Sequence, residues 1–415
     1  MEDKRIAITG MGMVSALGHT ARESYETACK GITGFRRCDE LLWGEHGEQL
    51  KCRVAATVVD LDAEHVINPK IRKTYSRGTL YALVAGEEAI TDAAIPPDEA
   101  VRERVGIVIG SACPSIDLYH RMCWDVFEEG KAHRLSGSVA PQISTTAPAA
   151  QMAMRHGFRG PNLVMSTACA SGASVLTLAG DQIRAGRADI VVAGGTESPV
   201  TPMTIGSFLT ARAMNPTDDP EGCYRPFDAA RAGMVLGEGS GFFVVEEWDH
   251  AVSRGARIYA ELLGSAMTED AYHMWAPEPG SWARTIELAL RDAGIGPTDV
   301  DYVSAHGVGT LTDTAETAAL KSALGDHAYD VPVSATKSMH GHAFAASAAM
   351  ESILALQAMS EGRVLPTVGL SEPDPECDLD YVPDLDRQQG SEILLKNGFG
   401  FGGTNTVVVL RLVRP

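Results

Sequence analysis

The segment Pro161-Asn-Leu-Val-Met-Ser-Thr-Ala-Cys169-Ala-Ser-Gly-Ala-Ser-Val-Leu-Thr-Leu-Ala-Gly180 decides the fold of this chain. Its apolar run, residues 163–165, predicts a β-strand, and the small residues of 170–184 predict a helix. The turn between them would expose Cys169. A helix N-terminus carries unpaired N–H groups and a partial positive charge, so we expect it to favour the thiolate of Cys169. The segment therefore predicts a sulfur nucleophile at a strand-to-helix turn.

Two later segments place histidines directly after a predicted strand. They are Ser304-Ala-His306-Gly-Val-Gly-Thr310 and Ala335-Thr-Lys337-Ser-Met-His340-Gly-His342. We expect these histidines to be the partners of the sulfur. The His-x-His pair has no cysteine or carboxylate beside it, so it is a weak metal signal and His340 is interpreted as incidental.

Short β-branched runs alternate with alanine-rich stretches along the chain, which predicts an α/β fold. Strands are expected in two series at residues 5–9, 105–109, 163–165, 190–193 and 242–246, then 258–264, 302–305, 331–334, 392–396 and 406–412. The two series share one order, as a duplicated unit would. We therefore expect two halves, residues 1–250 with the cysteine and 251–415 with the histidines. An insertion at 113–144 lacks a clear pattern.

Composition narrows the possible functions. The chain of 415 residues is 45% hydrophobic, which is ample for a buried core, and its formal charge of −19 argues against nucleic-acid binding. The charged residues at the start do not resemble a signal peptide, and no run is long enough to span a membrane. A cytoplasmic location is expected. The eight cysteines are scattered, so reduced thiols are expected too.

Four elements together resemble one enzyme family: Thr167-Ala-Cys-Ala-Ser-Gly172, Ala305-His-Gly307, Lys337-Ser-Met-x-Gly-His342 and Gly398-Phe-Gly-Phe-Gly-Gly-Thr-Asn405. In this order they look like an elongating type II β-ketoacyl-[acyl carrier protein] synthase or a ketosynthase subunit of a type II polyketide system. The resemblance runs from residue 5 to residue 412. It implies a thiolase-like duplicated fold with five layers, α-β-α-β-α, in which residues 113–144 form caps and dimer contacts.

The same resemblance implies a role for each motif residue. Cys169 would carry the acyl group, and His306 and His342 would donate hydrogen bonds to the enolate formed when malonyl loses CO₂. Lys337 would pair with Glu351, which lies inside an apolar stretch, unless either side chain reaches solvent. The backbone N–H groups of Cys169 and Phe401 would form an oxyanion hole, and the phenyl ring of Phe401 would gate the pocket.

Substrate contacts are implied in the same way. Val308 stands where fatty-acid members usually have threonine, which leaves Thr310 to bind the phosphopantetheine arm. Small residues stand where family members narrow the acyl tunnel, and they predict room for a long or rigid acyl chain. These residues are Cys113, Ser138 and Val139. Phe399 is interpreted mainly as a packing residue of the pocket wall.

The partner implied by the resemblance is an acyl carrier protein, whose phosphopantetheine holds the substrates. An acidic carrier needs a basic patch on this acidic chain, and the residues that align with family docking positions are Lys70, Arg72, Lys73 and Arg212. A solvated helix face is the alternative for each of them. The chain is expected to form a homodimer or a heterodimer with a chain-length-factor subunit.

Neither a metal nor a cofactor is expected. The glycine-rich run at 397–405 leads from one strand into another without a helix, and the run at 10–18 lacks the third glycine of a dinucleotide-binding loop.

Polyketide synthesis is the favoured interpretation, and three alternatives to it are fatty-acid elongation, a non-catalytic chain-length subunit and a thiolase. Polyketide synthesis, with a possible polyene product, is favoured by residues 197–202 and 374–383, and fatty-acid elongation by residues 167–170 and 402–405. A non-catalytic chain-length subunit typically lacks the cysteine. A thiolase would need a second catalytic cysteine, and Cys377 lacks the required context.

Overall fold

The computed structural model describes residues 4–39 and 50–414. Its main feature is a ten-stranded mixed sheet in the order β10-β9-β11-β12-β8-β1-β7-β6-β4-β5. The strands of this sheet are β1 (Ile6–Ser15), β4 (Val105–Gly110), β5 (Asn162–Met165), β6 (Ile190–Glu197), β7 (Gly239–Glu247), β8 (Ala260–Glu269), β9 (Tyr302–Ser304), β10 (Val333–Ser334), β11 (Ile393–Phe399) and β12 (Thr404–Leu412). A separate antiparallel pair consists of β2 (Phe35–Arg37) and β3 (Val54–Ala56).

The strand order shows an internal duplication. When the five strands of each series are numbered along the chain, both halves of the sheet follow the order 3-2-4-5-1 from the outer edge inward. In each half the three outer strands are parallel to one another, and each of the next two strands is antiparallel to the neighbour before it. The halves join along β1 and β8 through only two residue pairs. The predicted duplicated α/β fold is confirmed, while the division at residue 250 stays a prediction.

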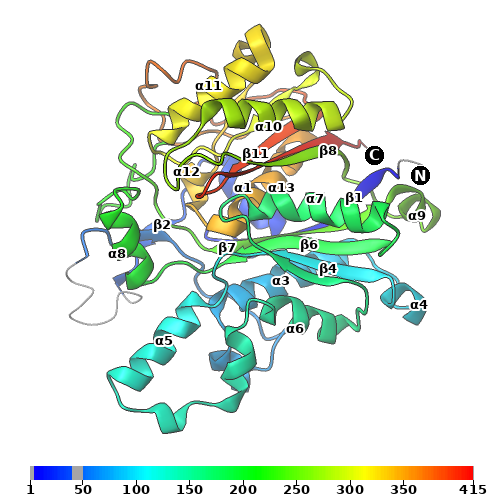
Figure 1. Cartoon of the computed structure of the whole chain (residues 1–415), viewed down its shortest axis with the longest axis vertical. Coiled ribbons are helices and arrows are strands. Elements are labelled where there is room, and N and C mark those ends of the chain that lie inside the picture. Colours follow the sequence, from blue (N-terminus) through cyan, green and yellow to red (C-terminus); the bar gives the residue numbers. More distant parts are fainter. Residues whose placement is uncertain (1–3, 40–49, 415) are drawn as a thin grey trace.

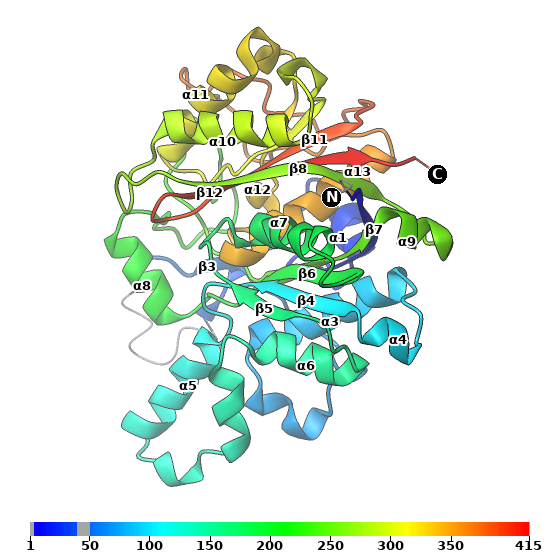
Figure 2. The same ribbon diagram turned by 45° about the vertical axis from the view of Figure 1, so that its right-hand side comes forward.

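Five layers of helix and sheet are visible in Figure 1. Helices α3 and α6 cover the outer face of the first half, and α10 and α11 cover that of the second half. Helices α7 and α13 lie between the halves and contact strands of both (Figure 2). The α-helices are α1 (Ala21–Cys29), α3 (Arg77–Asp92), α4 (Glu99–Arg102), α5 (Ile116–Phe127), α6 (Ala147–His156), α7 (Ser171–Arg184), α8 (Pro202–Thr210), α9 (Trp248–Ser253), α10 (Pro279–Asp292), α11 (Thr312–Leu324), α12 (Lys337–His340) and α13 (Ser347–Ser360). Short 3₁₀ turns are η2 (Pro69–Thr74), η3 (Ala132–Arg134), η4 (Gly137–Ile143), η5 (Pro297–Asp299), η6 (Gly325–Tyr329) and η7 (Phe344–Ala346).

Small residues let the middle layer pack closely. A Cβ atom added to Gly195 of β6 would lie 2.3 Å from the carbonyl oxygen of Ala345, and one added to Gly172 of α7 would lie 2.7 Å from the same oxygen. The backbone of the segment just before α13 therefore packs directly against the backbones of β6 and α7. At the centre of the molecule the buried helices therefore make contacts through their backbones and not through long side chains.

The first strand is longer than the sequence predicted. β1 continues to Ser15, through the glycine-rich run that begins at Gly10. A Cβ atom at Gly12 would lie 2.1 Å from the carbonyl oxygen of Ala85, so α3 packs directly on this strand. The glycines therefore serve helix–strand packing.

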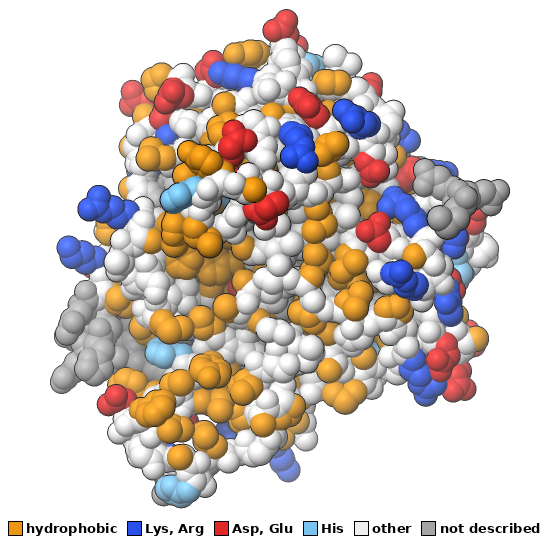
Figure 3. Space-filling model, in the orientation of Figure 1, with side chains coloured by type: hydrophobic (Ala, Val, Ile, Leu, Met, Phe, Trp, Pro, Cys, Tyr) orange, Lys and Arg blue, Asp and Glu red, His pale blue; other side chains and the backbone are white. Residues whose placement is uncertain are grey.

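Residues 113–144 form a lobe that projects from the first half, built from α5, η3 and η4 (Figure 1). Hydrophobic side chains gather on its surface (Figure 3). The exposed large ones are Tyr119, Phe127, Leu135 and Ile143. The role of this lobe in capping and dimer contacts stays a prediction.

None of the described helices has both the length and the apolar character needed to cross a membrane. The expected cytoplasmic location stays a prediction. All eight cysteines lie in the described part of the chain and are free thiols.

The contact at Gly195 yields a stability prediction. Replacing Gly195 by alanine forces its Cβ against the Ala345 carbonyl, so we expect the free energy of unfolding to fall by about 1–3 kcal/mol. Urea unfolding measures this change. Gly137→Ala is the control, because a Cβ there meets nothing within 4 Å. Equal stability of the two variants would contradict the close approach.

Candidate active site

Cys169 lies at the tip of a tight turn between β5 and α7. Ala168 has a φ of 48°, the left-handed region that non-glycine residues rarely adopt, and α7 begins two residues after the cysteine. Ser171 stabilises this turn, because its hydroxyl accepts a hydrogen bond from the N–H of Thr167 and donates one to the carbonyl of Ala168. The cysteine side chain is 4% exposed. The turn thus presents the sulfur to a pocket, not to bulk water.

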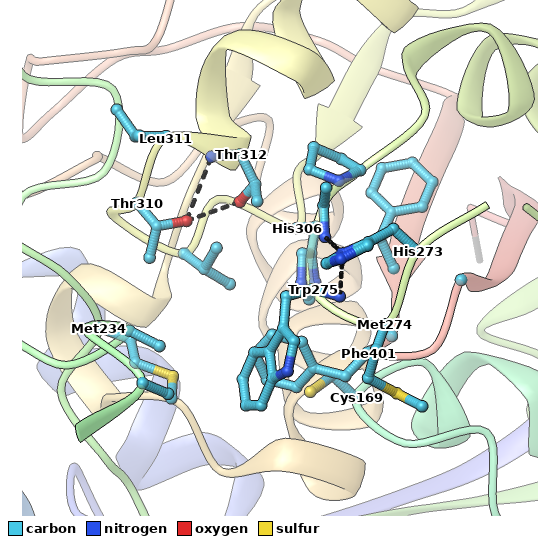
Figure 4. A pocket seen from close by; sticks show the side chains of 18 of the residues that line it. Cys169, Met234, His273, Met274, Trp275, His306, Thr310, Leu311, Thr312 and Phe401 are labelled. Atoms are coloured by element: carbon cyan, nitrogen blue, oxygen red, sulfur yellow. Dashed lines mark hydrogen bonds between the residues drawn. The ribbon is translucent and has the colours of Figure 1, made fainter. Parts of the chain in front are cut away.

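The two predicted histidines come from the second half. His306 follows β9, and His342 follows α12 and precedes α13. Because the halves are duplicates, His342 occupies the place before the central helix that Cys169 occupies in the first half. Both histidines and the cysteine line one pocket of about 360 Å³ (Figure 4). The two imidazole rings are 5.7 Å apart between centroids and nearly perpendicular.

The surroundings keep both imidazoles neutral. Burial is the main cause that lowers the pKa of His306 well below its usual value, and the positive charge of Lys337 lowers it further. Burial followed by Lys337 also lowers the pKa of His342. The Nδ1 atom of His342 is 3.1 Å from the Ser347 hydroxyl, which accepts from the N–H of Ala343. When Ser347 donates to Nδ1, the proton of His342 lies on Nε2.

The electrostatics of the sulfur differ from the expectation. Burial raises the pKa of Cys169 to about 12, although Lys337 and the backbone groups of Phe401 and Cys169 itself act in the opposite direction. The expected resting thiolate is therefore wrong for the free protein, because desolvation outweighs the helix N-terminus. The backbone groups of Phe401 and Cys169 are nevertheless placed at the sulfur, where the sequence analysis put an oxyanion hole.

Behind the histidines lies a buried cluster of charges. Glu351 of α13 is 1% exposed, and its Oε1 atom is 2.6 Å from the Nζ atom of Lys337. Its Oε2 atom is 2.5 Å from the Nζ atom of Lys396, which the sequence analysis missed. Although burial alone would raise the pKa of Glu351, Lys337 and Lys396 lower it below its usual value. The carboxylate is thus held charged between two ammonium groups.

Aromatic rings cover the sulfur side of the pocket. Phe401 lies 4.8 Å from Trp275 and 5.7 Å from Phe208 between ring centroids, and Phe208 lies 5.3 Å from Phe344. Figure 4 shows Trp275 and Phe401 side by side next to Cys169. His273 fixes the turn before this ring, because its Nδ1 atom accepts from the N–H of Trp275 at 3.1 Å. Trp275 and Phe401 thus form part of the pocket wall beside the sulfur.

Other predicted residues divide between the pocket and the surface. Thr310 lines the pocket, and its hydroxyl is 2.8 Å from that of Thr312. Phe399 also lines it and stacks on Trp282 at 3.9 Å. Three predicted tunnel residues do not line the pocket of the single chain: Cys113, Ser138 and Val139. Cys113 and Ser138 are exposed, and Val139 is buried within η4.

The predicted docking residues are exposed. Lys70, Arg72 and Lys73 lie together on η2, whereas Arg212 lies at the pocket. The neighbouring Arg77 instead points inward and donates to Glu238 at 2.5 Å. Among the described residues, no group of three His, Cys, Asp or Glu side chains could hold a metal ion. The expectation of no metal or cofactor stays a prediction.

Sequence reasoning also missed the carboxylates that hold the His306 turn. Glu316 accepts from the N–H groups of His306 at 2.7 Å and Gly307 at 2.8 Å. Asp313 accepts from the N–H of Val308 at 3.0 Å. Asp313 and Glu316 lie three residues apart at the start of α11, on one helix face. Two acidic residues at this spacing, directly after a histidine turn, are a signal that could have found them.

Comparison with known proteins identifies the family. The chain matches the β-ketoacyl synthase N-terminal domain over residues 3–251 and the C-terminal domain over residues 259–371. It is 37% identical to a 3-oxoacyl-[acyl-carrier-protein] synthase 2 of Synechocystis sp., with 99% of each chain covered.

Two solved structures are also similar over 99% of this chain and 100% of theirs, each with a TM-score of 0.90. One, 32% identical, is a type II polyketide ketosynthase in complex with its acyl-carrier protein and bound to the hexaketide. The other, 31% identical, is the ishigamide ketosynthase/chain length factor. The chain belongs to the β-ketoacyl synthase family and is a ketosynthase, that is, an acyltransferase.

Proposed function

We propose that this ketosynthase extends an acyl chain on an acyl carrier protein by decarboxylative condensation with malonyl. The observation that carries the proposal is the single pocket into which three separate turns bring one thiol and two neutral imidazoles. A thiol can hold an acyl group as a thioester, and neutral imidazoles can donate hydrogen bonds to a developing enolate.

The first step is acyl transfer to Cys169. The sulfur attacks the carrier-bound thioester, a new carbon–sulfur bond forms, and the carrier leaves as a free thiol that takes the cysteine proton. The N–H groups of Cys169 and Phe401 hold the negative oxygen of the tetrahedral intermediate. Since burial disfavours the thiolate, binding of the acyl carrier must supply the environment in which the thiol loses its proton.

The second step joins two carbons. The bond between the malonyl carboxylate and its methylene carbon breaks, CO₂ leaves, and the electron pair delocalises onto the thioester oxygen. His306 and His342 donate hydrogen bonds to that oxygen. The enolate carbon then attacks the acyl thioester on Cys169, and the sulfur leaves and regains a proton. Burial keeps both rings neutral, which is the form that acts as donor in this step.

Carrier recognition is proposed from charge and position. The chain carries a net charge of −19, so an acidic carrier needs local positive charge to approach it. The exposed basic residues Lys70, Arg72, Lys73 and Arg212 supply it, and Arg212 lies at the pocket itself. The paired hydroxyls of Thr310 and Thr312 can then bind the amide groups of the phosphopantetheine arm.

Two pathways remain candidates for this reaction. Fatty-acid elongation is supported by 37% identity over the full length to a 3-oxoacyl-[acyl-carrier-protein] synthase 2. Polyketide extension, with a possible polyene product, is supported by the structural similarity to a type II polyketide ketosynthase and by the small residue Cys113 at the predicted tunnel. Incubation with each type of carrier protein, followed by mass spectrometry of product length and oxidation level, decides between them.

We also propose that the enzyme works as a dimer. β5 is the outer strand of the first half, so its backbone edge is open, and the exposed apolar side chains of the lobe project on the same half. A second subunit there would complete the acyl tunnel at Ser138 and Val139. A catalytically silent role for this chain is disfavoured, because the cysteine and both histidines meet in one pocket.

The raised pKa of Cys169 predicts the pH dependence of its alkylation. Because the thiolate is the reactive form, the rate of labelling by iodoacetamide in the free protein should rise steadily between pH 7 and 9. Mass spectrometry of the Cys169 peptide separates this label from that of exposed Cys113. A rate that reaches a plateau below pH 8 would contradict the effect of burial.

Two variants separate the two chemical steps. Cys169→Ala should form no acyl-enzyme and no condensation product, yet still release CO₂ from malonyl carrier protein. His342→Ala should lose decarboxylation by about 10²-fold or more, because a donor to the enolate is gone. His65→Ala, an exposed histidine, is the control. Unchanged condensation by Cys169→Ala would rule out the proposed nucleophile.

The dimer proposal predicts the mass of the particle in solution. Sedimentation of the purified chain should give twice the mass of one chain. A monomer that forms a one-to-one complex with a second ketosynthase-like subunit would support the heterodimer instead. A monomer under both conditions would contradict the proposed interface.

A further inference from the structure

Lys396 is a fully buried lysine without a role in the chemistry described so far. It lies on β11, is 0% exposed, and reaches the centre of the second half. Its Nζ atom lies 2.5 Å from Glu351, and it donates to the carbonyls of Ser304 at 3.1 Å and Ala305 at 3.0 Å. A buried ammonium group is costly unless it is paired, and here the two carbonyl acceptors and the opposite charge of Glu351 offset that cost.

The two carbonyls bound by Lys396 belong to the turn that carries His306. The next carbonyl, that of His306 itself, accepts a hydrogen bond from Lys337. Three consecutive carbonyls are therefore bound by two ammonium groups. On the opposite side of the turn, the N–H groups of His306 and Gly307 donate to Glu316. The backbone of the histidine is thus held by charged groups from both sides.

Neutralising Glu351 does not by itself require Lys396. Lys337 already pairs with one carboxylate oxygen at 2.6 Å, and one cation would balance one anion. Lys396 adds a second positive charge to this dry region, on the side that faces the histidine turn. The adjacent Asn397 donates to Glu316 at 2.9 Å, so two successive residues of β11 bind groups that hold His306.

We propose that Lys396 is a positioning residue, which fixes the His306 turn through the carbonyls of Ser304 and Ala305 and places a second positive charge behind the two imidazoles. This inference rests on the proposed condensation, in which both rings act as neutral donors. It assigns Lys396 to the decarboxylation step and not to acyl transfer, because its contacts are with the histidine turn and not with the turn of Cys169.

The charged and titratable groups that surround Lys396 come from five segments. They are Glu351 of α13, Lys337 and His340 of α12, Glu316 of α11, and His306 and His342 of the two turns. Burial lowers the pKa of Lys396 to about 8, although Glu351 acts to raise it. The ammonium form is thus present below about pH 8 and is lost above it. Lys396 in turn lowers the pKa of both His306 and His342.

The test replaces Lys396 by methionine, an unbranched side chain that is one atom shorter and carries no charge. Lys337 still neutralises Glu351 in this variant. We expect the kcat for decarboxylation of malonyl carrier protein to fall about 10- to 100-fold, since the His306 turn loses two anchors. The KM and the rate of acyl-enzyme formation at Cys169 should change little. The acid limb of the pH–rate profile should move to higher pH, because both histidines lose a nearby cation.

Lys321→Met is the matched control, because Lys321 is a partly exposed lysine of α11 that pairs with Asp378 at the surface. It should leave the rate and the pH profile unchanged. A Lys396→Met enzyme with the decarboxylation rate and acid limb of the wild type would overturn the inference. Equal losses of acyl transfer and decarboxylation would overturn it too, since they would indicate a structural role alone. A wild-type enzyme that releases no CO₂ would instead refute the proposed condensation.

A second measurement guards against a variant that fails to fold. The decarboxylation rate of an enzyme that keeps Lys396 should fall as the pH rises through about 8, where Lys396 loses its charge. Cys169→Ala is used as the background, so that ionisation of the nucleophile does not contribute. A rate that stays constant to pH 10 would overturn the assignment of Lys396.

Discussion

The site depends on one constraint, which is that the charge of a carboxylate buried between the two halves of the sheet must be neutralised. Two lysines from different elements pair with Glu351. Each lysine also donates hydrogen bonds to the backbone around His306. Removing one member of such a buried pair typically costs about 3–5 kcal/mol. The charges that stabilise the core therefore also fix the geometry of the histidine turn. Burial is the larger cause that lowers the pKa of both imidazoles, and the two lysines lower it further, so that both rings are neutral and suited to donate hydrogen bonds.

The duplicated fold explains how the reacting groups meet. In each half a turn precedes a central helix, α7 or α13, and both helices lie in the layer between the halves; in the second half α12 stands between the third strand and this turn. The first turn carries Cys169 and the second carries His342. Because small residues such as Gly172 and Gly195 allow backbone contact across this layer, the two turns face one pocket. In the proposed reaction the chemistry is thus divided between the halves, with the acyl-bearing Cys169 in one and the two histidines that would bind the enolate in the other.

Much of this arrangement could be predicted from local patterns. The strand, turn and helix around Cys169 have a clear apolar and small-residue signal, and the position of His306 directly after a strand follows from the same reasoning. The prediction that His342 also comes directly after a strand is wrong, because α12 separates it from β10. Long-range electrostatics could not be predicted in this way. The sequence around Cys169 indicates a helix N-terminus, but only the packed structure shows that burial outweighs it. Lys396 ends a predicted strand, where a lysine usually reaches solvent, and only the paired strands show that it points to Glu351. Trp275 lies in a segment without periodicity, and its contact with Phe401 comes from a distant loop.

The central claim is that two buried, neutral imidazoles share one pocket with the sulfur. Nitrogen-15 NMR of labelled histidines, with His306→Ala and His342→Ala spectra for assignment, measures the charge of each ring directly. The account predicts that both rings stay neutral as the pH is lowered through the usual histidine range, because burial and the nearby lysines disfavour the imidazolium. Uptake of a proton by either ring near pH 6.5 would contradict it.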